Sequence, residues 1–302
     1  MLELPVDFDA PSSPTGEEPE QERGFAAGLK VFAANRLAVA GLAVIVAFLL
    51  FCFVGPFLYR TNQVATDIAQ ANLPPGAGHL LGTDSVGYDV LGRLMAGGRI
   101  TLVVAILVAV LAVAVGLIWG ATAAYVGGIV DDVMMRVVDA WLAIPSLFLL
   151  IFLDALLRPS VLVLIAVISA LAWMAPARLV RAEVLSLKTL PYVEAARGAG
   201  ATGAGVLRRH LLPNVVGTIV VNATFQVADA VLTVAALSFL GLGIPPPAAN
   251  WGSMLSNGVD YVFAGYWWQI WPAGVAIVLV VVAFNFVGDG LRDAVDVRLR
   301  RR

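Results

Sequence analysis

Long apolar runs alternate with short polar segments over most of the chain. Six runs of about 20 or more residues carry few charges, at residues 37–58, 100–125, 133–157, 160–177, 215–242 and 266–287. About 20 apolar residues in helical form cross the hydrocarbon core of a bilayer. The pattern therefore predicts an all-α polytopic membrane protein with six transmembrane helices, the fourth extending towards residue 185. An even number of spans places both termini on one side of the membrane.

The composition agrees with a membrane protein and excludes several other classes. Hydrophobic residues make up 60% of the 302 positions and charged residues only 13%, against about 25% in soluble domains. The net charge of −2 gives no reason to expect a nucleic-acid partner. Cys52 is the single cysteine, so neither an internal disulfide nor a cysteine metal cluster is expected. His79 and His210 are far apart in sequence, and we expect no metal or cofactor in this chain.

The polar segments divide the chain further. Residues 1–30 are predicted to form an acidic cytoplasmic tail that is disordered because it has too little apolar surface to bury. Residues 31–98 would hold the first transmembrane helix and an external loop with a short interfacial helix at 86–95, capped by Thr83 or Asp84. Residues 99–290 would form the transmembrane core. Gly288 and Gly290 would end the last span before a basic cytoplasmic tail at 291–302.

The distribution of basic residues predicts the orientation. Of the 19 Lys and Arg residues, 15 fall on the side that holds the termini, and four (Arg60, Arg93, Arg99 and Arg158) fall on the other. Cytoplasmic loops carry the excess of Lys and Arg. Both termini and the polar segment 188–214 are therefore predicted to be cytoplasmic.

The segment 188–214 is the most polar stretch between two spans. Helix formers follow Pro191 up to Arg197, and Gly198, Gly200, Gly203 and Gly205 allow a sharp turn. We expect a second short helix at 206–212, stopped by Pro213, with Asn214 capping the next helix. The glycines also spell G-x-G-x-x-G, but neither the strand nor the acidic residue of a dinucleotide site accompanies them. A helix–turn–helix that docks onto a partner is the better interpretation.

Three motifs carry a resemblance to a known family. Glu194-Ala195-Ala196, then Gly200 and Leu212-Pro213, resembles the EAA loop of ABC importer permeases of type I fold, and His210 points to the peptide-importer branch. LSFLGLG at 237–243 and GDGLRDA at 288–294 are similar to the same branch. The resemblance implies a coupling surface bound by ATPase subunits. Its expected residues are Glu194, Ala195, Ala196, Arg197, Gly200, Arg208, His210, Leu212 and Pro213.

The same resemblance implies the partners and the cargo. The chain would be the second permease subunit of a dipeptide, oligopeptide or nickel importer in a bacterial plasma membrane. It would pair with a paralogous permease, with two ABC ATPase subunits that hold ATP and Mg, and with an extracytoplasmic binding protein. Peptides are the leading substrates, with nickel chelates or glutathione-like molecules as alternatives.

Charged residues inside the predicted spans mark a candidate path or gate. Asp132, Arg136 and Asp139 share one helix face, where they either pair or line an inner gate, and Pro145 should kink this span. Asp229 falls near the middle of the fifth span, where it either pairs with another helix or faces a water-filled path. The family usually has Glu where this chain has Val234.

Missing motifs narrow the function. The chain has no G-x-x-x-x-G-K-[ST] phosphate loop and no nucleophile–base pair, so we do not expect an enzyme. The competing class is a stand-alone ion-coupled secondary transporter that uses Asp229 and Asp139. Such transporters usually carry inverted repeats, which are not evident in this sequence.

Overall fold

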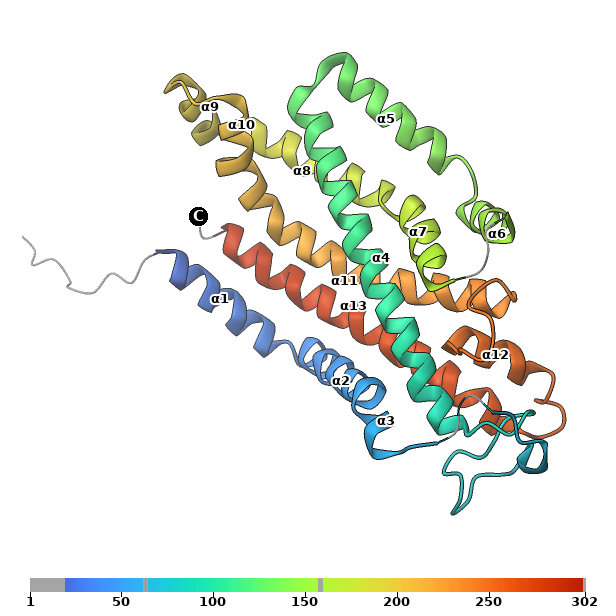
Figure 1. Cartoon of the computed structure of the whole chain (residues 1–302). Coiled ribbons are helices and arrows are strands. Elements are labelled where there is room, and N and C mark those ends of the chain that lie inside the picture. Colours follow the sequence, from blue (N-terminus) through green and yellow to red (C-terminus); the bar gives the residue numbers. More distant parts are fainter. Residues whose placement is uncertain (1–19, 62, 64, 157–159, 301–302) are drawn as a thin grey trace, which may run out of the picture.

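The computed structural model describes residues 20–61, 63, 65–156 and 160–300. Within these ranges the regular structure is helical and no β-strand is formed (Figure 1). The all-α class predicted from the sequence is confirmed. The helices are α1 (Glu20–Ala34), α2 (Arg36–Phe53), α3 (Gly55–Leu58), η1 (Ile68–Gln70), α4 (Val90–Val126), α5 (Gly128–Leu142), α6 (Ser146–Leu156), α7 (Val161–Ala172), α8 (Met174–Lys188), α9 (Pro191–Gly198), α10 (Gly203–Val206), η2 (Leu207–Leu211), α11 (Leu212–Phe239), α12 (Trp251–Val259), η3 (Trp267–Gln269) and α13 (Trp271–Arg300).

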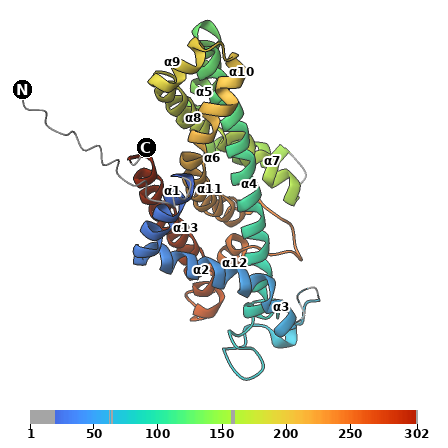
Figure 2. The same cartoon turned by 90° about the vertical axis from the view of Figure 1, so that its left-hand side faces the viewer.

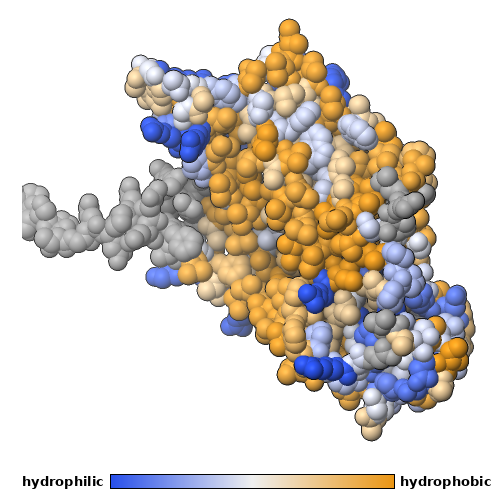
Figure 3. All heavy atoms as spheres, viewed as in Figure 1, coloured by the Kyte–Doolittle hydropathy of each residue, from blue (hydrophilic) through white to orange (hydrophobic). Residues whose placement is uncertain are grey.

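Among the described residues, five helical segments are long and apolar enough to cross a membrane, and the number is six if one bent pair forms a single span. The five are Arg36–Phe53, Val90–Val126, Val161–Lys188, Gly203–Phe239 and Trp267–Asp296. The pair is α5 and α6, which meet at 78° around Pro145. The predicted kink is therefore present, and it is sharp enough to break the span. In Figure 3 the middle of the surface is largely apolar, and hydrophilic residues gather at the upper left and the lower right, on either side of this apolar band.

Helix α4 lies at the centre of the bundle. It packs against α8, α11, α7 and α2, and its residues from Leu102 to Ala124 supply much of the buried core. Two glycines let α8 come close. A Cβ added at Gly120 would lie 2.2 Å from the carbonyl oxygen of Ala177, and one at Gly116 would lie 2.6 Å from Cβ of Pro176. Small residues at such crossings allow the close approach that drives helix association in lipid.

The start of α4 differs from the prediction. No separate interfacial helix forms at 86–95. Residues 84–88 make a turn, and α4 begins at Val90 and continues into the span. The Asp84 carboxylate accepts backbone N–H bonds from Val86 and Tyr88, so it closes the turn, while Asp89 caps the helix by accepting from Gly92 N at 2.7 Å. The cap is thus five residues later than Asp84 and six later than Thr83.

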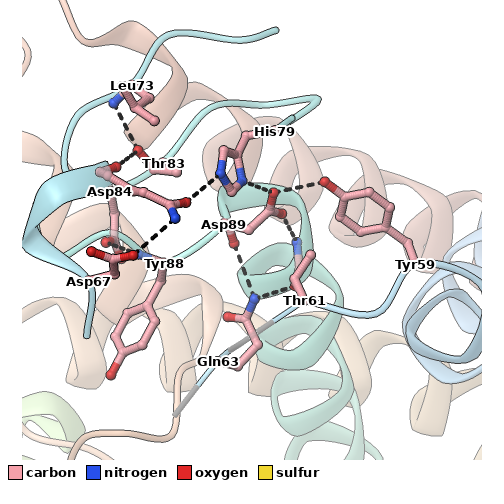
Figure 4. A network of polar contacts seen from close by, with 12 residues as sticks. Tyr59, Thr61, Gln63, Asp67, Leu73, His79, Thr83, Asp84, Tyr88 and Asp89 are labelled. Atoms are coloured by element: carbon pink, nitrogen blue, oxygen red, sulfur yellow. Dashed lines mark hydrogen bonds and ion pairs between the residues drawn. The ribbon is translucent and has the colours of Figure 1, made fainter. Parts of the chain in front are cut away.

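Polar contacts hold the loop before α4 in place (Figure 4). The buried Asp89 carboxylate accepts from the Tyr59 hydroxyl at 2.8 Å and lies 2.9 Å from His79 Nδ1. Burial, and then Asp89, raise the pKa of the Tyr59 hydroxyl. The buried Thr83 joins this loop to the segment before α13, because its carbonyl accepts from Trp268 Nε1 at 3.0 Å. The loop is therefore a fixed cap on this end of the bundle.

The last helix also differs from the prediction. Gly288 and Gly290 do not end α13, which continues to Arg300. Both glycines instead admit neighbouring helices. A Cβ on Gly290 would lie 2.3 Å from Cβ of Ala38, and one on Gly288 would lie 2.6 Å from Oγ1 of Thr224. Residues 291–300 are therefore not a separate tail.

The expected disorder of residues 1–30 is wrong from Glu20 onwards. Helix α1 packs along the end of α13, where a Cβ on Gly28 would lie 3.2 Å from the carbonyl oxygen of Ala294. The rest of that segment lies outside the described residues. Helix α1 and the end of α13 lie towards the end of the molecule that carries α9 and α10 (Figure 2).

Candidate functional site

The segment between α8 and α11 folds as a helix, a turn and a second helix. Helix α9 starts at Pro191, where a missing N–H costs little, and ends at Gly198. Gly200 makes the turn with φ of 85°, a conformation in which side chains are strained. Thr202 then starts α10 by accepting from Gly205 N at 3.3 Å. The predicted helix–turn–helix is confirmed, and of its four glycines only Gly200 has a positive φ.

One side of this motif is buried against the bundle. Val193, Val206 and Leu211 are each 0% exposed, and they cluster with Val184 of α8 and Ala124 of α4. Lys188 Nζ adds a polar anchor by donating to the carbonyl oxygens of Ala124 and Tyr125 at 3.1 and 3.3 Å, which satisfies two groups at the end of α4. The motif therefore has a fixed orientation relative to α4 and α8.

The other side of the motif is open. The predicted coupling residues Glu194, Ala195, Arg197, Gly200, Arg208 and Pro213 are exposed, and Ala196, His210 and Leu212 are half-buried. A hollow lined by the turn before α10, by α10 and by η2 has Arg208, Arg209 and His210 on its wall, so this side is basic. The ring of His210 lies 6.3 Å from that of Tyr192, which links η2 to α9. We call the exposed residues Glu194 to Arg209 the coupling surface.

Pro213 does not stop a helix, and Asn214 does not cap one. The helical path is continuous from Gly203 to Phe239, because residues 207–211 form a turn of π-helix. The proline ring would clash with a carbonyl four residues earlier in a regular α-helix. The wider π turn removes that conflict, and Asn214 Nδ2 donates to the His210 carbonyl at 2.6 Å. The coupling surface is thus joined to α11 without a break.

The predicted charge cluster on α5 is arranged differently. Asp139 pairs with Arg178 of α8, and more distantly with Arg136 at 3.8 Å. The stronger pair was not foreseen: Asp131 accepts from Arg181 Nε and Nη2 at 2.5 and 2.6 Å. Asp132, expected to pair, is exposed and forms no ion pair among the described residues. Spacing within one helix does not reveal Asp131, because its partner Arg181 is on α8.

We expect the Asp131–Arg181 pair to hold α5 against α8. Asp131→Asn should lower the free energy of unfolding by about 1.5–3 kcal/mol, because bonds to charged groups contribute this much and the Asp131 side chain is 10% exposed. Thermal unfolding in detergent measures the change. Asp132→Asn is the matched control and should leave the melting temperature unchanged. An equal fall in melting temperature in both variants would show that negative charge on α5 stabilises the fold irrespective of the Asp131–Arg181 pair.

Asp229 lies on the exposed side of α11. Within the described residues its carboxylate makes no hydrogen bond or ion pair, so the chain alone offers it no partner. Val234 is 0% exposed and lies about 140° away around the helix axis. An acidic group at 234 would point into the core of this subunit. Asp229 therefore does not replace it, and the two positions face different surroundings.

No cluster of three metal-ligating side chains occurs among the described residues. A family model described as "Binding-protein-dependent transport system inner membrane component" matches residues 112–301. The chain belongs to this family of inner membrane transport components. A second model, for the N-terminal TM domain of oligopeptide transport permease C, matches residues 27–75. The predicted family and a multi-pass location in the bacterial plasma membrane are confirmed.

Several relatives of this inner membrane component align over most of its length. The dipeptide transport system permease protein DppC of Bacillus subtilis is 39% identical over 88% of this chain and 83% of its own. The oligopeptide transport system permease protein OppC of the same organism is 39% identical over 89% of this chain and 88% of its own length. A putative peptide permease of Brucella suis is 42% identical over 88% and 89%. An alignment over 88% of the chain includes the coupling surface, and the family model at 112–301 also includes α13.

Proposed function

We propose that this component forms half of the translocation path of an ATP-driven importer for di- and oligopeptides, and that its coupling surface binds separate ATPase subunits. Relatives are named as permeases of dipeptide and oligopeptide transport systems, which supports the cargo. A paralogous permease would supply the other half of the path. An extracytoplasmic binding protein would deliver the peptide. The coupling surface and both termini would face the cytoplasm.

The observation that carries the proposal is the contrast between the two sides of α9 and α10. Val193 and Val206 are fully buried, whereas Glu194 and Arg197 beside them are exposed. A motif needed only to connect two spans would not require charged side chains held at fixed positions away from the bundle. Complementary charges at a protein interface fix the relative orientation of the two partners and raise their rate of association.

The same contacts give a route for movement. Force on α9 reaches α8 and α4 through the cluster around Val193, Val184 and Ala124. Force on α10 reaches α11 directly, because the helix is continuous from Gly203 to Phe239. Coupling of this kind travels through packed side chains and rigid elements. ATP-driven closure of the two ATPases would thus rotate α8 and α11 together and alternate the side on which the path opens.

Reconstitution tests the proposal. The component is co-expressed with a paralogous permease, ATPases and a binding protein from the same organism, purified, and placed in proteoliposomes. We expect the subunits to purify together and to accumulate radiolabelled dialanine only with ATP and binding protein. Accumulation of a nickel chelate or glutathione in place of dialanine would reassign the cargo within the family. Uptake by this chain alone under an ion gradient would instead identify a secondary transporter.

A further inference from the structure

Helix α11 carries a polar stripe along one face. Thr218, Asn222, Gln226, Asp229 and Thr233 are spaced by four, four, three and four residues, which places them on one side of the helix. The side chains between them are mostly apolar. Asp229 is exposed and the other four are half-buried, so this face of α11 is only partly covered by the rest of the chain. Polar and ionisable residues in a span usually face protein or a water-filled cavity.

The inner half of the stripe forms the floor of a groove. Helix α11 runs between α8 and α13 (Figure 1), and these two helices form the walls. The groove has a volume of about 410 Å³, within the range of small-molecule sites. Its lining includes Glu183 of α8, Thr218, Asn222 and Phe225 of α11, and Arg292 and Asp296 of α13.

One polar atom in this groove lacks a partner. Asn222 Oδ1 is buried and accepts no hydrogen bond from any described residue. A buried carbonyl oxygen left unbonded costs about 1–3 kcal/mol, so such atoms are rare in folded proteins. Gln226, one turn along the stripe, is already engaged, because its Nε2 donates to the Ala172 carbonyl at 2.8 Å. Asn222 Oδ1 is therefore a buried acceptor without a partner among the described residues, on a side chain that lines the floor of the groove.

The charges on the walls are of both signs. Glu183 and Asp296 supply carboxylates, and Arg292 supplies a guanidinium that forms bidentate bonds with carboxylates. A short peptide with free ends carries an ammonium group, a carboxylate and backbone N–H donors. These three groups match the acids, the arginine and Asn222 Oδ1. A lipid tail would match none of them.

We infer that the groove between α8, α11 and α13 is an inner binding station for a short zwitterionic peptide. Asn222 accepts a backbone N–H, Arg292 binds the carboxylate, and Glu183 or Asp296 binds the ammonium group. Asp229 lies further along the same stripe, where it attracts the ammonium group before the peptide reaches the station. The inference rests on the proposed function and adds a named site to it.

Cysteine accessibility tests the station, because the native Cys52 is 0% exposed. Asn222→Cys is introduced into the full transporter in nanodiscs without nucleotide. Labelling of this chain by a charged methanethiosulfonate is followed by mass spectrometry. We expect the introduced thiol to react, and dialanine at ten times its dissociation constant to slow the reaction about ten-fold, since protection follows occupancy. N-acetyl-dialanine amide, which lacks both charges, should not protect.

Two further variants keep the result interpretable. Thr218→Cys repeats the test one turn along the groove with Asn222 intact, and should be protected in the same way. Val220→Cys lies on an apolar face that is 46% exposed and should resist the charged reagent. No labelling at 218 and 222, or labelling that dialanine does not slow, would overturn the station. If wild-type proteoliposomes still import dialanine in that case, the proposed function stands. If they import no peptide, the proposed function itself fails.

Discussion

Glu194→Lys should reduce ATP-dependent uptake by at least about ten-fold while leaving the amount of folded component in the membrane unchanged. The Glu194 side chain is exposed and makes no hydrogen bond or ion pair within the described chain. Its main contribution to stability is therefore the attraction between its negative charge and the positive N-terminal end of the α9 helix dipole. That contribution is about 0.3–1 kcal/mol, far below what unfolds a protein. At a docked interface, however, a misplaced like charge costs several kcal/mol, and each 1.4 kcal/mol is ten-fold.

Uptake by proteoliposomes and melting temperature in detergent are measured on the same preparations of Glu194→Lys. Asp293→Lys is the matched control, since it reverses an exposed carboxylate at the same end of the molecule on α13 and away from the coupling surface. It should retain uptake. A large fall in melting temperature for Glu194→Lys would show that Glu194 supports the fold instead. Normal uptake would show that no partner contacts it.

Gly120→Val should remove most of the folded protein. Its Cβ would lie 2.2 Å from the Ala177 carbonyl oxygen and 3.0 Å from the Arg181 nitrogen, and neither backbone atom can move without displacing α8. Overpacking usually costs about 1–3 kcal/mol, and a backbone collision at the centre of the bundle should reach at least that range. Helix α8 also carries Lys188 and Val184, so the coupling surface would lose its support.

Size-exclusion chromatography of a fluorescent fusion in detergent measures the effect of Gly120→Val. The expected result is a loss of the monodisperse peak. Gly274→Val serves as the control, because a Cβ there meets only Leu255 Cδ2 at 3.6 Å, an ordinary contact. It should keep its peak. Loss of the peak in both variants would mean that glycine in any span is needed for insertion. A normal peak in both would mean that the glycine at the crossing of α4 and α8 is not required.

The apolar runs and the motif at 191–212 could be predicted because they depend on local chemistry. The helix–turn–helix follows from Pro191, the exposed charges and Gly200. Each of these residues affects the backbone only of its near neighbours in the sequence. The kink at Pro145 is local in the same sense. The position of a span follows from its length and hydropathy alone.

Errors arose where a distant contact overrides a local signal. Gly288 and Gly290 suggest the end of a helix, but α2 and α11 pack onto them and the helix continues. Pro213 suggests a stop, but a π turn accommodates it. Asp84 and Asp89 are both good caps in sequence. Asp84 closes the turn before α4, whereas Asp89 caps the helix and also contacts Tyr59 and His79. The outcomes at the two glycines and at Asp89 depend on residues that are far away along the chain, whereas the π turn before Pro213 is formed by its neighbours.

Photo-crosslinking tests the coupling surface most directly. A photoreactive residue replaces Gly198, where an added side chain meets nothing within 4 Å, and the control replaces Gly78 in the loop before α4, which is equally open. In the assembled transporter, we predict that position 198 forms an adduct with an ATPase subunit and that position 78 does not. An adduct with the ATPase at position 78, or none at position 198, would contradict the account.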